Sequence, residues 1–563
     1  TLMAVLYDTG MSEDETMDAV KEIRKLADGQ CFVSGMSAVI TDIKDLSDKE
    51  VPIYVLIAVI LAIVVLSLTM DSAVVPIFFL LSIGMAIIYN LGTNIMQGEI
   101  SYVTQALAAV LQLGVTMDYS IFLWHSYEEE CANTDDHKEA MANAITNTIT
   151  SVVGSSITTV AGFVALCFMS FTLGLDLGIV MAKGVVFGVI GCVTILPAMI
   201  LIFDKAVQKT RHRAIIPDLG RIAGWVVRHY KWFIAAFVII LFPALYGYTH
   251  TDVYYDLAGT LPKDLPSIVA NQKLEDSFDM NATHIYLIDS SLPTKDVVEM
   301  IDEVNEVDGV KATIGLEAIL GAGFPKEMLP SDLLKVVQND EYELLMVSSE
   351  YAVASDEVNA QCDKLDEILD KYDTKGMLIG EAPCTKDLIN ITNEDFARVS
   401  AVSIVAIFVI IFFVFKSISL PIILVAVIEF AIFINMGIPA YTGTVLPFIA
   451  SIVIGTIQLG ATVDYAILMT NKYKNARYDG LEKKEAITQA LQGSIQSIIV
   501  SALSFFSATF GVGVYSNIDM ISSLCILMSR GAIISMFVVI FILPSMFMIF
   551  DKVIIKTSKG FRQ

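Results

Sequence analysis

Two carboxylic acids in apolar surroundings are the residues of this sequence best suited to chemistry. Asp118 and Asp464 each lie in a long apolar segment, and each is followed directly by a tyrosine, Tyr119 or Tyr465. A carboxylate inside a membrane is costly, so it is a candidate functional group by default. Burial and a nearby second carboxylate would both favour the protonated form. A phenol hydroxyl can donate to the ionised acid or accept from the protonated one. We therefore predict two Asp–Tyr pairs that load and release protons.

A glycine stands four residues before each aspartate, at Gly114 and Gly460. This spacing puts the glycine and the acid on one face of a helix. Because glycine lets helices approach closely, we expect the two aspartate-bearing helices to pack against each other there. The alternative is that each buried Asp–Tyr pair only holds helices together.

Other polar side chains could modulate the aspartates. Ser155 and Ser501 belong to two matching series of small hydroxyl residues at helical spacing, which fit either a proton path or tight helix packing. Lys183 and Arg530 occupy matching positions, where they could pair with the aspartates or extend to the outer membrane surface. Glu429 has no acidic counterpart, and could face lipid or substrate.

The elements that must position these residues are membrane-spanning helices. Hydrophobic residues make up 55% of the 563 residues and charged residues only 17%, outside the range of soluble proteins. The net charge of −25 argues against nucleic acid as a partner. No phosphate-binding GxxxxGK[ST] loop is present, which excludes ATP-driven transport encoded in this chain, and no metal-ligand spacing is seen. Spans need about 20 apolar residues. We predict eleven: 52–69, 73–92, 103–124, 148–170, 177–203, 232–248, 399–415, 419–437, 444–469, 495–515 and 520–550.

The sequence also repeats itself. Residues 113–119 match 459–465, and Leu196-Pro197 matches Leu543-Pro544. We predict two parallel six-helix repeats related by an axis along the membrane normal. The first helix of the first repeat, and the first part of its outer domain, are expected to be missing from this chain. The predicted parts are a partial outer domain (1–50), five helices (51–205), a basic linker (206–231), one helix (232–248), a second outer domain (249–397), five helices (398–552) and a tail (553–563).

Charge predicts the orientation of these parts. The basic segments 204–231 and 471–485 should face the cytoplasm, which places the acidic segment 249–395 outside. Alternating and helical apolar patterns predict a ferredoxin-like α+β domain there, and a partial one near the N-terminus. The expected elements are strands at 283–289, 342–350 and 375–380, helices at 294–308 and 355–373, and a strand, a helix at 11–28 and a strand within 2–34.

Two GxxxDY helices, six-helix repeats and ferredoxin-like outer domains resemble the resistance-nodulation-division (RND) superfamily, and within it the MMPL branch (mycobacterial membrane protein large) of hydrophobe/amphiphile exporters. Glu128-Glu129 and the two Leu-Pro helix endings fit the same branch. The resemblance implies a polytopic α-helical protein of the plasma membrane whose extracytoplasmic porter domains pass lipids or other hydrophobic molecules. It would be driven by the proton-motive force through Asp118, Tyr119, Asp464 and Tyr465.

The same resemblance implies a transporter and not an enzyme, with no cofactor besides the coupling protons. A homo-oligomer or an accessory protein is a possible partner. Alternatives are an RND-type accessory of protein translocation, a receptor-like sterol-sensing member, and, least favoured, an intramembrane aspartyl protease. Sodium could replace the proton.

Overall fold

The computed structural model describes residues 2–3, 5–27, 29, 31–98, 100–212, 219–256, 259–278, 280–320, 334 and 337–559. The chain divides into two compact units. The mixed unit comprises residues 1–46 and 254–393, and the helical unit comprises residues 47–253 and 394–563. Part of the predicted basic linker, residues 213–218, lies outside the described residues.

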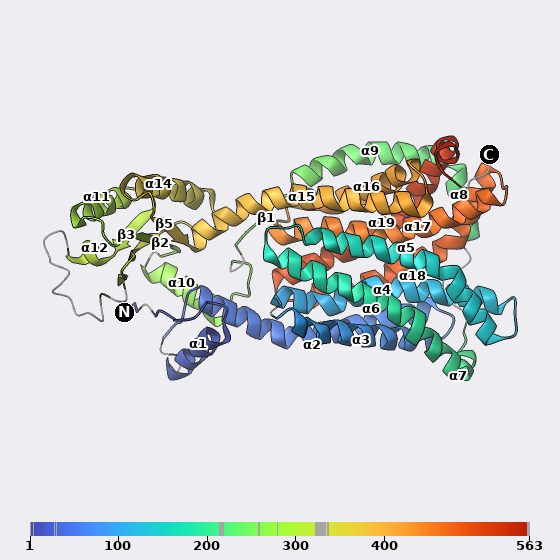
Figure 1. Ribbon diagram of the computed structural model, residues 1–563, viewed down its shortest axis with the longest axis horizontal. Helices are drawn as coiled ribbons and strands as arrows, with labels where there is room; N and C mark the ends of the chain where they lie inside the picture. The colour runs from blue at the N-terminus through green and yellow to red at the C-terminus, as the bar shows by residue number, and fades with distance from the viewer. Residues whose placement is uncertain are drawn as a thin grey trace. The chain divides into compact units, whose positions relative to one another are not determined.

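The helical unit consists of long helices that run side by side (Figure 1). Eleven helices of the described chain are long and apolar enough to cross a membrane, and each predicted span overlaps one of them, which confirms the predicted spans. They are α2 (Met36–Thr69), α3 (Val75–Thr93), α4 (Tyr102–Cys131), α5 (His137–Leu166), α6 (Thr172–Ile202), α9 (Tyr230–Thr249), α15 (Glu381–Phe415), α16 (Ser419–Thr442), α17 (Phe448–Tyr478), α18 (Lys483–Tyr515) and α19 (Asp519–Thr557). Short elements connect them: η1 (Asn94–Met96), α7 (Asp204–Lys209), α8 (Gly220–Arg228), β1 (Val253–Tyr254) and β6 (Leu446–Pro447).

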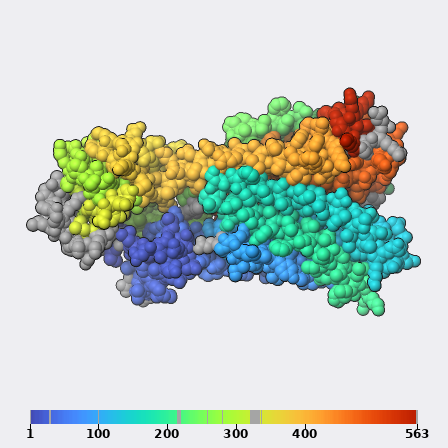
Figure 2. Space-filling view, viewed as in Figure 1, coloured from blue at the N-terminus to red at the C-terminus, as the bar shows by residue number. Residues whose placement is uncertain are grey.

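Burial separates central helices from peripheral ones. In α4 the most apolar stretch is entirely buried, and in α17 89% of that stretch is buried. In α9 and α2 only 11% and 22% of the corresponding stretch is buried. Helices that are apolar all round and exposed are suited to contact with lipid. Side chains close the gaps between the ribbons on the visible face of the helical unit (Figure 2). The two aspartate-bearing helices therefore form the centre of this unit.

The mixed unit contains a four-stranded sheet in the order β3-β4-β2-β5, in which every neighbouring pair is antiparallel. The strands are β2 (Ala282–Asp289), β3 (Val310–Ile314), β4 (Tyr342–Ser349) and β5 (Met377–Gly380). The helices are α1 (Asp14–Ala27), α10 (Pro266–Phe278), α11 (Thr294–Asn305), α12 (Leu316–Leu320) and α14 (Asp356–Tyr372). Along the chain, β2, α11, β3, β4, α14 and β5 give a β-α-β-β-α-β order, with the short helix α12 between β3 and β4.

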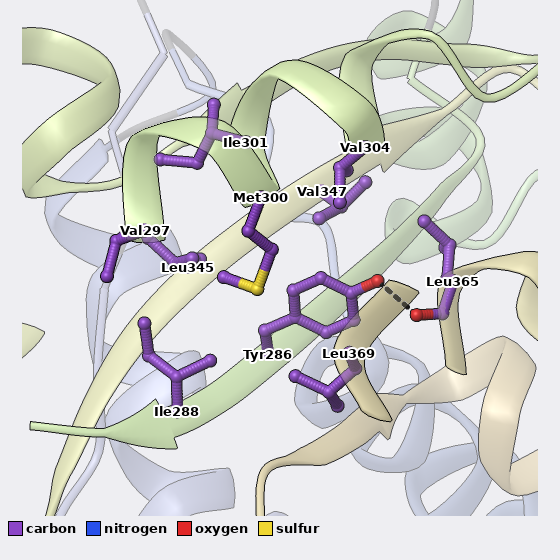
Figure 3. Packing of buried hydrophobic residues seen from close by; sticks show 10 residues of the cluster. All are labelled: Tyr286, Ile288, Val297, Met300, Ile301, Val304, Leu345, Val347, Leu365 and Leu369. Carbon is purple, nitrogen blue, oxygen red and sulfur yellow. Dashed lines mark hydrogen bonds between the residues drawn. The ribbon is translucent and has the colours of Figure 1, made fainter. Parts of the chain in front are cut away.

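The core of the mixed unit lies between this sheet and its helices. Alternate residues of β2 are buried, as expected for a strand with one covered face. Tyr286 lies in the middle of the core, and its hydroxyl donates a hydrogen bond to the carbonyl of Leu365, 2.6 Å away (Figure 3). Apolar side chains of α11, among them Met300, pack around it (Figure 3). The phenol thus fills the core while its polar end is satisfied.

Some sequence predictions for this unit need correction. The strands predicted at 283–289, 342–350 and 375–380 and the two helices between them are present, but the short strand β3 was missed. The prediction for residues 2–34 is wrong in part: α1 is present, but the described residues of this range contain no strand. A strand exists only when a partner pairs with its backbone, and local alternation does not specify that partner.

Candidate functional site

The two Asp–Tyr pairs lie together in the centre of the helical unit. Asp118 and Asp464 are each only 2% exposed, and Tyr119 and Tyr465 are also buried. The carboxyl groups are near enough for the charge of Asp118 to act on Asp464, and both tyrosines lie within the field of both acids. None of the four side chains faces the lipid-exposed surface. The structure therefore brings the four predicted residues into one buried site.

Each aspartate faces a helix from the other half of the chain. Asp464 on α17 lies against α5, where the hydroxyls of Ser155, Thr158 and Thr159 are close enough to interact with its carboxyl group. Asp118 on α4 lies against α18, where the hydroxyl of Ser501 is close enough to interact with its carboxyl group. The two predicted serines thus lie beside the aspartates, one on each side of the site.

The two predicted glycines mark close contacts, but not with the partner that we predicted. A methyl group added at Gly162 of α5 would lie 3.2 Å from the Cα of Gly460, so the backbones of α5 and α17 nearly touch. Thr159 of α5 also donates a hydrogen bond to the carbonyl of Gly460 at 3.1 Å. A methyl group at Gly114 would lie 3.1 Å from the ring of Phe505 on α18. Gly460 therefore allows α5 to pack closely against α17, and Gly114 allows α18 to pack closely against α4. The prediction that these glycines bring the two aspartate-bearing helices into contact is wrong.

The two sides of the site are not chemically alike. Phe505 of α18 occupies the position that Thr159 occupies in α5, so a ring replaces a hydroxyl beside Asp118. The hydroxyl of Tyr119 donates to Thr159 at 3.5 Å. Ser501 and one carboxyl oxygen of each aspartate are buried without a hydrogen-bond partner among the described residues. Unpaired buried polar atoms cost about 1–3 kcal/mol each. Such groups are available for a proton or a water molecule.

Lys183 and Arg530 contact polar groups away from the aspartates. The ammonium group of Lys183 donates to Asn94 at 2.7 Å and to Gln97 at 3.1 Å, just beyond α3. Arg530 donates to the side chain of Asn435 at 2.8 Å and to its carbonyl at 2.7 Å. In the described part of the chain, neither cation forms an ion pair with an aspartate of the site. Lys183 thus holds the segment that follows α3, whereas Arg530 joins α19 to α16 within the length of α16.

Sequence reasoning missed a pair of buried amide networks next to the site. Asn90 donates to Gln112 at 2.9 Å, and Gln112 donates to the carbonyl of Gly184 at 3.0 Å. Asn435 and Gln458 repeat the first of these bonds at 2.8 Å. Gln112 and Gln458 stand six residues before Asp118 and Asp464, on the same helices. Polar residues that recur within apolar spans at nearly the same offset, 345 residues for the asparagines and 346 for the glutamines, were the signal that could have revealed them.

Glu429 lies apart from the aspartates, on α16. It is partly buried, and its charge acts on Tyr248 of α9. Among the described residues, no group of three or more His, Cys, Asp or Glu side chains is arranged to hold a metal ion. The side chains that meet at the aspartates carry carboxyl, phenol and hydroxyl groups.

Comparison with known proteins identifies the family. A model of the MMPL family matches residues 3–233 and 295–560. Similar proteins include the putative membrane protein MJ1562 of Methanocaldococcus jannaschii, 26% identical over 235 residues (40% of this chain, 58% of the relative). The membrane protein YdfJ of Bacillus subtilis is 22% identical over 309 residues (53% and 42%). The probable transport protein MmpL12 of Mycobacterium tuberculosis is 23% identical over 256 residues (44% and 22%).

The matched region of the chain thus spans less than two thirds of each of these relatives, from 22% to 58% of their lengths. The family match, in contrast, covers most of the chain, and it confirms the resemblance drawn from the GxxxDY helices. This multi-pass membrane protein belongs to the MMPL family.

Proposed function

We propose that this protein is a proton-coupled secondary transporter of the RND type, which exports lipids or other hydrophobic or amphiphilic molecules. The observation that carries this proposal is the burial of Asp118 and Asp464 within reach of each other's charge, each against a hydroxyl-bearing helix of the other half. An ionised carboxylate only accepts hydrogen bonds, whereas a protonated one also donates. Proton binding therefore changes which contacts each aspartate makes with α5 or α18, and so changes how these helices pack.

The proposed orientation places the basic segments in the cytoplasm and the mixed unit outside the plasma membrane. Its β-α-β-β-α-β order is that of a ferredoxin-like unit, which supports its assignment as a porter domain. The matched amide networks and matched aspartate sites support two six-helix repeats. We propose that a partner protein, or a second copy of the chain, acts only after export, by carrying the cargo onward beyond the membrane.

Magnitudes constrain the path of the cargo. One proton that crosses a potential of about 150 mV releases about 3.5 kcal/mol. Moving a chain of about 16 carbons fully into water costs about 13 kcal/mol, at about 0.8 kcal/mol per methylene. One or two protons do not supply that energy. The cargo must therefore stay in contact with apolar surface along its whole route.

The test replaces each aspartate by its neutral isostere. The full chain and the variants Asp118→Asn and Asp464→Asn are reconstituted into liposomes that contain a pH-sensitive dye and a fluorescent phospholipid as the cargo probe. We expect both variants to lose proton-driven movement of the probe, and Glu429→Gln, a matched membrane carboxyl outside the site, to retain it. Unchanged transport by the folded aspartate variants would refute the proposal. Transport that follows a sodium gradient instead would correct the coupling ion.

A further inference from the structure

A buried carboxylate ties α15 to the turn that follows α5. Asp395 of α15 is fully buried. It accepts hydrogen bonds from the backbone N–H of Ser170 at 2.7 Å, from the hydroxyl of Ser170 at 3.0 Å and from the N–H of Phe171 at 3.2 Å. Ser170 and Phe171 lie in the turn between α5 and α6. Asp395 thus holds this turn through three hydrogen bonds, and Arg398 of the same helix adds one to the Ser170 hydroxyl at 3.2 Å.

A second buried carboxylate ties α2 to the turn that follows α18. Glu50 of α2 accepts hydrogen bonds from the side-chain amide of Asn517 at 2.6 Å and from its backbone N–H at 3.3 Å. Glu50 also accepts from the hydroxyl of Tyr54, which in turn lies 2.8 Å from the hydroxyl of Ser516. Ser516 and Asn517 lie in the turn between α18 and α19. The two halves of the chain therefore carry the same kind of link.

These links join the helices that line the aspartates to the helices that enter the mixed unit. The helix α5 carries the hydroxyls beside Asp464, and α18 carries Ser501 beside Asp118. The helices α2 and α15 both begin in the mixed unit and end in the helical unit. Hydrogen bonds from backbone N–H groups to a carboxylate are directional and charge-assisted. They resist sliding more than apolar contacts between helices do.

We propose that Asp395 and Glu50 are positioning residues that transmit the protonation state of the site to the mixed unit. Neutralisation of Asp464 moves α5, and Asp395 passes that movement to α15. Neutralisation of Asp118 moves α18, and Glu50 passes that movement to α2. This inference rests on the proposed function, and it assigns to each aspartate its own route out of the membrane.

The chain carries natural reporters for this transmission. Cys384 lies on α15 and Cys31 lies shortly before α2, and both thiols are exposed. The full chain in lipid nanodiscs is labelled with a maleimide, and mass spectrometry gives the labelling rate at each cysteine. All variants are compared at one pH, because thiol reactivity itself depends on pH.

A double-mutant cycle then measures the coupling. We expect Asp464→Asn to change the labelling rate of Cys384 by about 5-fold or more, the lower end of typical allosteric coupling. In a chain that already carries Asp395→Ala, Asp464→Asn should change the labelling rate of Cys384 by less than about 2-fold. The parallel cycle uses Asp118→Asn and Glu50→Ala, with Cys31 as the reporter.

Asp176 supplies the matched control. It accepts a hydrogen bond from the backbone N–H of Ser101 at 2.6 Å, so its carboxylate holds the residue that precedes α4 and not a turn linked to α2 or α15. The variant Asp176→Asn should leave both couplings intact. A labelling change that persists after removal of Asp395, or no change on neutralisation of Asp464, overturns the inference.

Transport separates this inference from the proposed function. In liposomes, Asp395→Ala and the milder Asp395→Asn should keep the wild-type pH at half-maximal transport while the maximal rate falls, by about 10-fold for the alanine variant. A shift of the pH midpoint without a loss of maximal rate counts against a transmitting role. Transport that is insensitive to Asp118 and Asp464 refutes the proposed function itself.

Discussion

The contact between α5 and α17 at Gly162 gives the sharpest structural prediction. A methyl group at this position would lie 3.1 Å from the carbonyl oxygen of Thr456 and 3.2 Å from the Cα of Gly460. Both neighbours are backbone atoms, so only a retreat of the whole helix relieves the contact. Overpacking of this kind costs about 1–3 kcal/mol. Replacement of a helical glycine by alanine also gains about 1 kcal/mol of helix propensity.

Gly154, on the same helix, separates these two effects. A methyl group there would meet only the methyl groups of Val414, at 3.9 Å, which is an ordinary contact. We expect Gly154→Ala to be neutral or to stabilise the protein by up to about 1 kcal/mol. Gly162→Ala should be less stable than Gly154→Ala by about 1–3 kcal/mol, since the propensity gain cancels in this comparison.

The assay is equilibrium unfolding in mixed detergent micelles, with transport measured on the same preparations. Because the retreat of α5 also withdraws Thr159 from Asp464, Gly162→Ala should lose transport while Gly154→Ala keeps it. Equal stability of the two variants would refute the close approach of α5 and α17, and with it the placement of the α5 hydroxyls at Asp464.

Three further predictions follow from single contacts. Thr159→Val keeps the shape of the side chain but removes the hydroxyl that lies beside Asp464 and donates to Gly460. Proton-driven transport in liposomes should fall by about 10-fold, the effect of losing about 1.5 kcal/mol from a hydrogen bond to a charged group. Gln112→Leu removes one of the two acceptors of the buried Asn90 amide and leaves only the Val180 carbonyl, so it should destabilise the protein by about 1–3 kcal/mol in equilibrium unfolding. His284 of β2 is fully buried, and burial lowers its pKa. The folded state thus holds this imidazole neutral, whereas the unfolded chain takes up a proton near about pH 6.5. The contribution of His284 to the stability of the mixed unit should therefore be greatest above about pH 6.5 and fall as the pH drops below it. Hydrogen–deuterium exchange of β2 peptides measures this fall, and His284→Leu should abolish its pH dependence.

Each of these predictions has an outcome that contradicts it. Full transport by Thr159→Val would show that this hydroxyl of α5 takes no part in proton binding at the site. Wild-type stability of Gln112→Leu would mean that the amide network contributes nothing measurable. Exchange of β2 that is equally protected on both sides of pH 6.5 in the wild-type chain would show that His284 is not held neutral by burial.

The sequence by itself determined the membrane-spanning helices and the candidate site residues. A spanning helix satisfies all its backbone hydrogen bonds within one segment, so an apolar run of sufficient length is enough to predict it. The aspartates at 118 and 464 stand out for a similar reason, because a carboxylic acid within such a run is expensive and is repeated here with its glycine and tyrosine. Both inferences use residue types and spacings alone and need no knowledge of which segments meet in space.

Only the tertiary structure decided which groups meet across the helices. The sequence placed Gly460 on the face of Asp464 but did not reveal that this face meets α5. It also left two roles open for Lys183, pairing with the aspartates or extending to the outer membrane surface, whereas Lys183 contacts Asn94. The pattern of residues 2–34 likewise predicted strands, whereas the described residues of this range contain none. Helix packing and strand pairing depend on the shapes and backbone groups of segments far apart in the chain, and local patterns do not encode that choice of neighbour.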